Sequence, residues 1–106
     1  MKKVMIFCNA GMSSSLMAKK VTDLLNKKGK NIQVEATTTS DSRNIVQKDK
    51  FDLYLVSPQT KMYFKTISDY AQPFDKPVDN IPFNAYVPTP AGLENLTKII
   101  LKHVDG

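Results

Sequence analysis

The chain has 106 residues, of which 42% are hydrophobic and 24% charged, and this balance predicts one globular domain, residues 1–106, with one core. No apolar run approaches the roughly 20 residues that cross a bilayer. The apolar run that follows Lys3 is too short for a signal peptide and is followed by no cleavage site. We therefore expect a cytoplasmic protein without direct membrane insertion, and its single cysteine, Cys8, to be a free thiol.

The net charge is +5, and Arg43 is the one arginine among fifteen basic residues. The lysines are scattered along the chain and do not alternate with aromatic residues, as they would on a nucleic-acid-binding stripe. The charge pattern therefore indicates a solvated, lysine-rich surface and no nucleic-acid partner.

Hydrophobic periodicity predicts strands that alternate with helices along the whole chain. The expected strands are residues 3–7, 32–37, 52–56 and 77–81, with residues 80–84 extended as the chain leaves the sheet. The expected helices run from 13–15 to 28, from 41 or 42 to 47, from 60 to 71, and onward from Pro90, which fits the first turn of a helix.

Alternating strands and helices predict an α/β fold in three layers: a four-stranded parallel sheet of order 2-1-3-4 with helices on both faces. Ligands of such folds bind at the carboxyl edge of the strands. Cys8, residues 57–59 and residues 82–86 each follow a strand at that edge. The topology therefore predicts that three distant segments gather around one thiol.

The segment from Cys8 to Ser14 has the spacing of the cysteine phosphate loop of tyrosine-phosphatase-like enzymes, in which five residues separate a cysteine from an arginine. Gly11 allows close approach of the backbone to a ligand. The hydroxyls of residues 13–15 can bind phosphate oxygens or cap a helix, whose positive end would favour both a thiolate and a phosphoryl group. The expected phosphate-binding residues are Asn9, Ala10, Gly11, Met12, Ser13, Ser14 and Ser15.

Several groups that a phosphatase needs are missing from the sequence. Ser14 stands where the arginine would be, and residues 82–91 contain no acid to protonate a leaving group. His103 near the end of the last helix is expected to be solvated, and no metal site is expected. The pattern favours a thiol that accepts and hands on phosphate. A buried structural cysteine followed by an ordinary helix cap remains an open alternative.

The segment from Phe7 to Leu16 resembles the phosphorylation loop of the enzyme IIB component of bacterial phosphoenolpyruvate-dependent sugar phosphotransferase systems. The resemblance is to the lactose, cellobiose and chitobiose type, in which phe-cys-x-ala-gly-met-ser-thr/ser-ser-leu recurs. Residues 52–59 resemble the third strand of that family and the gly-pro-gln that closes it, with Ser57 in place of the glycine. The late segment keeps Tyr86 and Gly92 but has Pro82 and Ala91 at its acidic positions.

The resemblance implies a phosphotransferase that carries phosphocysteine and uses no small-molecule cofactor. A IIA protein would donate a phosphoryl group from its phosphohistidine to Cys8. Cys8 would pass it to a sugar, a β-linked disaccharide such as cellobiose, chitobiose or lactose, bound to the membrane component IIC. The chain would then act at the inner face of the membrane through IIC. Gln59 would reach the phosphoryl group or cap the next helix, and Tyr86 would lie beside Cys8 or pack in the core.

Two other functions stay open from the sequence. One is a small cysteine phosphatase or arsenate-reductase-like enzyme, which the missing arginine argues against. The other is a binding domain that uses the same fold without chemistry at Cys8.

Overall fold

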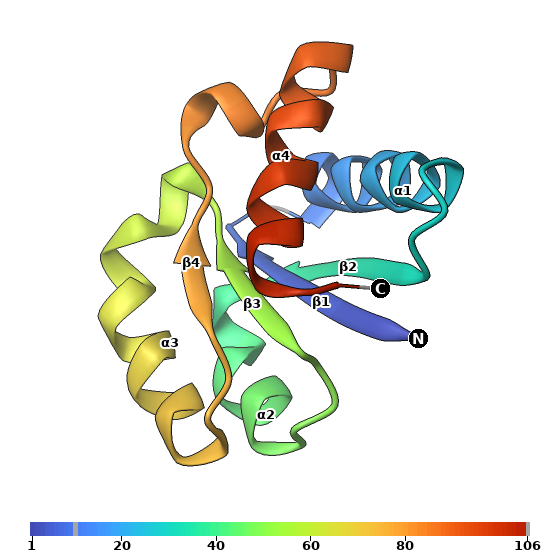
Figure 1. Ribbon diagram of the computed structural model, residues 1–106. Coiled ribbons are helices and arrows are strands. Elements are labelled where there is room, and N and C mark those ends of the chain that lie inside the picture. Colours follow the sequence, from blue (N-terminus) through green and yellow to red (C-terminus); the bar gives the residue numbers. More distant parts are fainter. Residues whose placement is uncertain (10, 106) are drawn as a thin grey trace.

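Four parallel strands form the sheet of the computed structural model, which describes residues 1–9 and 11–105 and, for residues 11–14, the backbone alone. The strands are β1 (Lys2–Cys8), β2 (Ile32–Thr38), β3 (Leu53–Val56) and β4 (Val78–Asn80). Their order is β2-β1-β3-β4, and each neighbouring pair is parallel (Figure 1). The predicted sheet and its order are confirmed.

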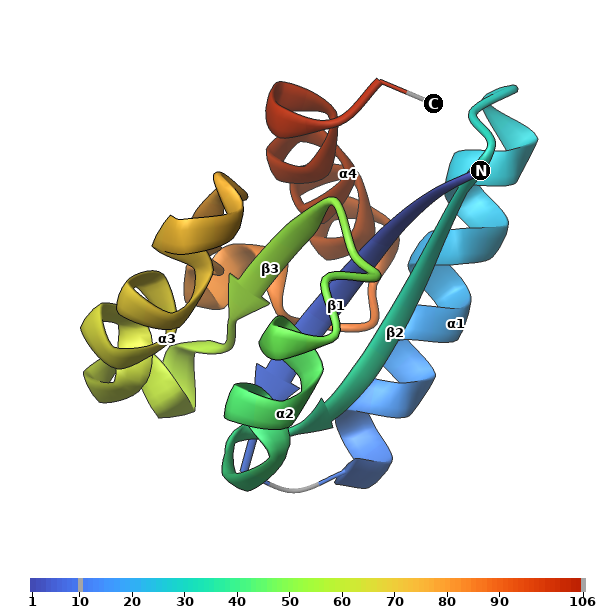
Figure 2. The same ribbon diagram turned by 90° about the horizontal axis from the view of Figure 1, so that it is seen from below.

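Helices cover both faces of the sheet, as expected. They are α1 (Gly11–Lys27), α2 (Ser42–Gln47), α3 (Phe64–Ala71) and α4 (Pro90–His103). Helices α1 and α4 share one apolar cluster with the sheet, and α2 and α3 share a second cluster on its opposite face (Figure 2). No helix in the described part of the chain is long and apolar enough to span a membrane.

The central strand β1 is buried on both of its faces. Val4 and Ile6 belong to the cluster beneath α1 and α4, whereas Met5 and Phe7 belong to the cluster beneath α2 and α3. Each of these side chains is at most 4% exposed. Because burying one such side chain contributes about 1.5–3 kcal/mol, β1 anchors both layers and holds its own carboxyl end in place.

The first helix begins earlier than the sequence pattern predicts. It starts at Gly11 rather than at residues 13–15, so the hydroxyl-rich segment lies within its first turns. Its buried side is formed by Met17, Ala18, Val21 and Leu25. Only Asn9 and Ala10 therefore separate Cys8 from the helix.

The prediction of a helix over residues 60–71 is wrong for the first turn. A 3₁₀ segment, Pro58–Tyr63, comes first, and α3 begins only at Phe64. Within the 3₁₀ segment, Thr60 has φ −116° and ψ 20°, which are not helical values. The Thr60 hydroxyl lies 3.3 Å from the Ser57 carbonyl oxygen, three residues earlier, and local contacts of this kind compete with regular helix.

The prediction of extended chain over residues 80–84 is also wrong beyond Ile81. The Ile81 amide donates the last hydrogen bond from this segment to β3, at 2.8 Å from the Val56 carbonyl oxygen. Pro82 follows and has no amide proton to continue the ladder. The chain then turns through the 3₁₀ segment Phe83–Ala85.

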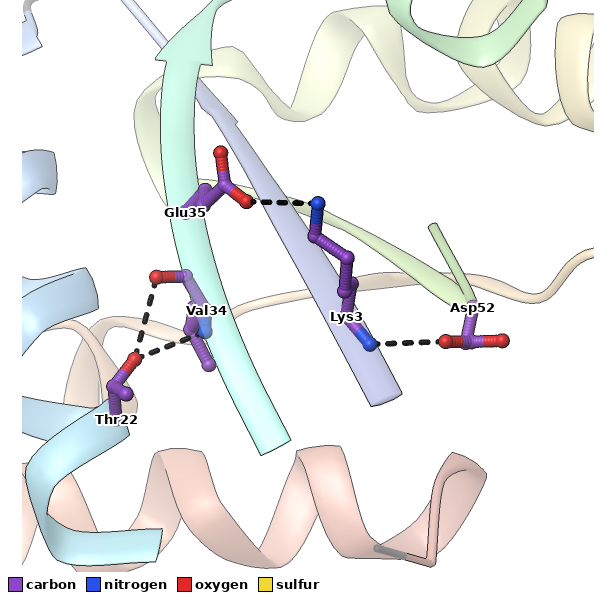
Figure 3. Close-up of polar contacts among 5 residues, drawn as sticks. All are labelled: Lys3, Thr22, Val34, Glu35 and Asp52. Carbon is purple, nitrogen blue, oxygen red and sulfur yellow. Dashed lines mark hydrogen bonds and ion pairs between the residues drawn. The ribbon is translucent and has the colours of Figure 1, made fainter. Parts of the chain in front are cut away.

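The strand β2 lies at one edge of the sheet, and Thr22 of α1 covers part of it. The Val34 amide donates to Thr22 Oγ1 at 2.9 Å, and the Thr22 hydroxyl lies 3.3 Å from the Val34 carbonyl oxygen (Figure 3). Across the strands, Lys3 Nζ lies 3.4 Å from Glu35, and the Lys3 amide donates to the Asp52 carboxylate at 2.9 Å. Thr22 therefore satisfies backbone groups that an edge strand would otherwise present to another chain.

Tyr54 of β3 carries a buried hydroxyl that has no hydrogen-bond partner among the described residues. Its ring stacks on Phe7, with ring centroids 5.9 Å apart, and packs against Phe51 at 6.2 Å. Burial, helped by the negative charges of Asp49 and Asp52, raises the pKa of Tyr54 to about 12. The ring therefore stabilises the core, while the hydroxyl is desolvated without compensation.

We predict that Tyr54→Phe stabilises the protein by about 1 kcal/mol at neutral pH, because it removes an unsatisfied polar group and keeps the ring. The phenol of the unfolded chain ionises near pH 10, whereas folding holds it protonated until about pH 12. Wild type should therefore lose stability relative to Tyr54→Phe between these two pH values. Urea denaturation at pH 7 and pH 11 measures both effects, and a less stable variant at pH 7 would contradict the prediction.

Candidate functional site

Cys8 is the last residue of β1 and lies at the carboxyl edge of the sheet. It pairs with Thr38 of β2, and the residue is 3% exposed. Its thiol donates to the Thr37 carbonyl oxygen, with sulfur and oxygen 3.5 Å apart. This contact suits the protonated thiol, because the sulfur of a thiolate has no proton to donate.

The first helix begins three residues after Cys8, at Gly11. Asn9 and Ser15, two of the expected phosphate-binding residues, are exposed. Ala10 lies outside the described residues, as do the side chains of the other predicted loop residues, Met12, Ser13 and Ser14. The free amides of the first helical turn and the positive end of the helix dipole therefore follow the cysteine directly along the chain.

The end of β3 lies beside the end of β1, as the parallel topology requires. Phe7 pairs with Val56, and the Ser57 amide donates to the Phe7 carbonyl oxygen at 3.0 Å. Ser57, Pro58 and Thr60 are buried. The topology thus joins the residue before Cys8 to the turn after β3. Thr60 belongs to this turn, and the sequence patterns did not single it out. No local pattern marks it, because its distinguishing contact is with the Phe7 carbonyl oxygen of β1, 53 residues away.

Gln59 and Tyr86 were each expected either near the cysteine or in a structural role, Gln59 as a helix cap and Tyr86 in packing. Gln59 is exposed in the 3₁₀ segment after β3 and caps neither that segment nor α3, whose N-caps are Ser57 and Tyr63. Tyr86 is half-buried and packs against the cluster beneath α1 and α4. The structure therefore assigns Tyr86 a packing contact, whereas Gln59 projects from the same edge of the sheet as Cys8.

The late segment between β4 and α4 is held by its link to the last helix. The Thr89 hydroxyl accepts a hydrogen bond from the Gly92 amide at 3.2 Å, and Pro90 occupies the first turn of α4, as predicted. An added Cβ on Gly92 would collide with the carbonyl oxygen and Cγ2 of Val87. The absence of a side chain at Gly92 therefore allows this segment to pack closely on the helix.

Large exposed apolar side chains gather in the segments that follow the strands. Apart from Met1, the exposed large hydrophobic side chains that the structure describes are Leu16, Met62, Tyr63, Phe83 and Val87, which we call the apolar rim. Met62 and Phe83 are each 70% exposed. A cavity of about 310 Å³ opens between the turns after β3 and β4, lined by Pro58, Lys61, Asn80, Ile81, Pro82 and Phe83. Exposed apolar side chains around a cleft are typical of a surface that contacts another protein.

Negative charge is absent from the two turns that flank this cleft. Residues 57–64 and 81–91 contain no aspartate or glutamate, while Lys61 lines the cavity. His103, at the last residue of α4, is exposed as expected, and its Nε2 lies 2.8 Å from a carboxylate oxygen of Asp79. Among the described residues, no group of three or more His, Cys, Asp or Glu side chains could hold a metal ion. Because the two turns carry no carboxylates and Lys61 lines the cavity, this edge of the sheet suits an anionic group brought to the Cys8 thiol.

Residues 3–97 match the family described as the lactose/cellobiose-specific IIB subunit of the PTS system, the sugar phosphotransferase system. A search among curated proteins returns no match.

Two solved structures have the same fold. The lactose-specific IIB domain from Streptococcus pneumoniae superposes with a TM-score of 0.81 at 17% identity, over 98% of each chain. The cellobiose-specific IIB protein from Borrelia burgdorferi superposes with a TM-score of 0.71 at 22% identity, over 96% of this chain and 90% of that one.

We predict that Gly92→Ala destabilises the protein by about 1–3 kcal/mol and moves the late segment, because the new methyl group overpacks against Val87. This effect would outweigh the roughly 1 kcal/mol by which alanine usually favours a helix. Gly29→Ala is the matched control: it strains a backbone with φ +82° but meets no atom within 4 Å. Denaturation and amide chemical shifts of Val87 test this. Unchanged stability with unmoved Val87 shifts would refute it.

Proposed function

Because the chain belongs to the family of lactose/cellobiose-specific IIB subunits, which have a phosphoryl-transfer role in sugar uptake, we propose that Cys8 carries the phosphoryl group as phosphocysteine. The observation that supports this most is the position of Cys8. It ends the central strand at the carboxyl edge, just before the amino end of α1. Both the strand end and the helix end favour binding of an anionic group.

The chemistry of acceptance is a displacement at phosphorus. The Cys8 sulfur attacks a phosphohistidine of a IIA protein, the sulfur–phosphorus bond forms, and the phosphorus–nitrogen bond breaks. The thiol proton, which the Thr37 carbonyl accepts as a hydrogen bond in the resting protein, leaves and the departing imidazole nitrogen takes up one proton. The loop of residues 9–15 binds the phosphoryl oxygens, with Gln59 as a further candidate from the neighbouring turn.

Transfer of the phosphoryl group from Cys8 to the sugar is also a displacement at phosphorus. A hydroxyl of a sugar held by the membrane component IIC attacks phosphorus: the oxygen–phosphorus bond forms and the sulfur–phosphorus bond breaks. The sulfur leaves as a thiolate, and the proton lost by the sugar hydroxyl restores the thiol. A cysteine thiolate is a good leaving group, so the intermediate needs no acid from the late segment, which has none. We propose a β-linked disaccharide such as cellobiose, chitobiose or lactose as the sugar, and a cytoplasmic location at the inner face of the membrane through IIC.

Both partner proteins must approach the same edge, and the apolar rim is the surface that they would contact. Its side chains come from the segments that follow β1, β3 and β4, three strands whose carboxyl ends lie at the same edge of the sheet as Cys8. The absence of carboxylates from residues 57–64 and 81–91 removes a source of repulsion toward a phosphorylated donor. Apolar contact and weak positive charge together suit transient docking.

We predict that Cys8→Ser lowers phosphoryl acceptance by about a hundredfold or more, because a serine hydroxyl ionises far less readily than a thiol. Wild type, supplied with phosphoenolpyruvate, the general phosphotransfer proteins and IIA, should gain the mass of one phosphoryl group on Cys8. Thr66→Ala, an exposed change on α3, is the control and should behave as wild type. Equal labelling of Cys8→Ser would rule out the proposal, as would steady, Cys8-dependent turnover of an aryl phosphate, which indicates a phosphatase.

Docking at the apolar rim has its own test. Phe83→Ser should raise the KM for the phosphorylated donor about tenfold, because a well-placed aromatic contact contributes on the order of 1–2 kcal/mol to an interface. Since the side chain is 70% exposed, folding stability should change by less than about 0.5 kcal/mol. Phe83→Tyr keeps the apolar ring and should keep the KM of wild type. An unchanged KM in Phe83→Ser would remove Phe83 from the interface.

A further inference from the structure

Two buried hydroxyl groups lie directly behind the strand that ends in Cys8. Ser57 and Thr60 are both fully buried, in the turn that follows β3. Their side-chain oxygens are 2.9 Å apart, and Thr60 Oγ1 lies 3.2 Å from the Phe7 carbonyl oxygen. Thr60 Oγ1 also lies 3.3 Å from the Ser57 carbonyl oxygen. The backbone of β1 is thus joined to a side chain of another segment, one residue before the reactive thiol.

Each hydroxyl has only one proton, and this fixes the direction of the hydrogen bonds. Thr60 Oγ1 faces three oxygens, two of which are carbonyls that cannot donate. All the contacts are satisfied if the Ser57 hydroxyl donates to Thr60 and the Thr60 hydroxyl donates to the carbonyls of Phe7 and Ser57. The Phe7 carbonyl also accepts from the Ser57 amide at 3.0 Å. Two donors therefore bind the one carbonyl oxygen that precedes Cys8.

Hydrogen bonds that hold the Phe7 carbonyl oxygen in place also restrict the position of Cys8. The peptide group that joins Phe7 to Cys8 is planar, so two hydrogen bonds on its oxygen set the position of the Cys8 Cα. The Sγ atom is attached to that Cα through one further carbon. The hydrogen bond from Ser57 belongs to the regular ladder between β1 and β3, whereas the bond from Thr60 is additional to it.

We propose that Thr60 is a positioning residue for Cys8: its hydroxyl holds the Phe7–Cys8 peptide group and so aims the thiol at the incoming phosphoryl group. The proposal rests on the phosphoryl-carrier function given above. Displacement at phosphorus requires the nucleophile in line with the leaving group, and a misplacement of about 1 Å can lower the rate about a hundredfold. Valine would fill the same volume but could not donate, leaving the Phe7 carbonyl and the Ser57 hydroxyl each without one partner.

The test compares three variants in the full chain. Thr60→Val removes the hydroxyl and keeps the shape, Thr60→Ser restores the hydroxyl, and Thr97→Val is the matched control. Thr97 is 1% exposed in α4, and its hydroxyl donates to the Glu94 carbonyl at 2.7 Å, away from the cysteine edge. The control therefore loses one buried threonine hydroxyl without touching the Phe7 carbonyl.

For phosphorylation of Cys8 by phosphorylated IIA, we expect kcat to fall about tenfold in Thr60→Val with KM unchanged, since only the orientation of the nucleophile is altered. Thr60→Ser should lie within about twofold of wild type, as should Thr97→Val. A wild-type kcat in Thr60→Val would overturn the proposal. So would an equal fall in Thr97→Val, because it would trace the effect to lost stability.

Two further measurements do not depend on phosphoryl transfer. The ¹³C shift of the Phe7 carbonyl and the rate at which iodoacetamide alkylates Cys8 should both change in Thr60→Val and stay near wild type in the other two variants. If wild-type protein accepted no phosphate, the proposed function would fail, and these two readouts alone would decide whether Thr60 positions Cys8. No change in either would overturn the positioning role.

A measurement on wild type covers the case in which Thr60→Val does not fold. A hydroxyl proton held between buried oxygens exchanges slowly with water, so the Thr60 hydroxyl proton should be visible by NMR, with a nuclear Overhauser contact to the Cys8 Hα. A rapidly exchanging hydroxyl without that contact would overturn the proposal.

Discussion

The hydrogen bonds that hold β1 between β2 and β3 are the constraint on which the rest of this structure depends. Both neighbours run parallel to β1, so their carboxyl ends meet at one edge, and each adds a turn to the environment of Cys8. Because β1 is buried on both faces, the strand cannot shift along its axis without breaking two apolar clusters. The Cys8 sulfur is therefore attached to a strand that is packed on both faces, while the loop that would bind phosphate follows it.

A buried strand that ends in Cys8 and exposed apolar side chains in the turns after β3 and β4 suit a carrier better than a hydrolase. A carrier must present one nucleophile to two partners in turn, and it needs an open, apolar edge such as the one that Met62 and Phe83 supply. A hydrolase needs instead an acid for the leaving group and an enclosed charge partner, and residues 82–91 contain no acid. The late segment would therefore supply no carboxylate to help water attack a phosphoryl group on Cys8.

The sequence predicted the sheet order, the helices on both faces and the position of Cys8, because these follow from apolar periodicity and from the handedness of strand–helix–strand connections. It did not predict the 3₁₀ turn at residues 58–63, where an apolar pattern typical of a helix begins. In this turn the Thr60 hydroxyl bonds to a carbonyl of β1, a contact 53 residues away in the chain. A tertiary hydrogen bond of this kind has no local signature, and for the same reason Thr60 was not among the candidate site residues.

The lifetime of the phosphorylated protein tests most directly whether Cys8 is a carrier. Protein labelled at Cys8 would be separated from its donor and followed by intact mass, first alone and then with IIC-containing vesicles and a β-linked disaccharide. The account predicts a label that persists alone for many turnover times of the transport reaction and is lost to the sugar when IIC and sugar are added together. Loss of the label to water at the same rate in both cases would contradict it.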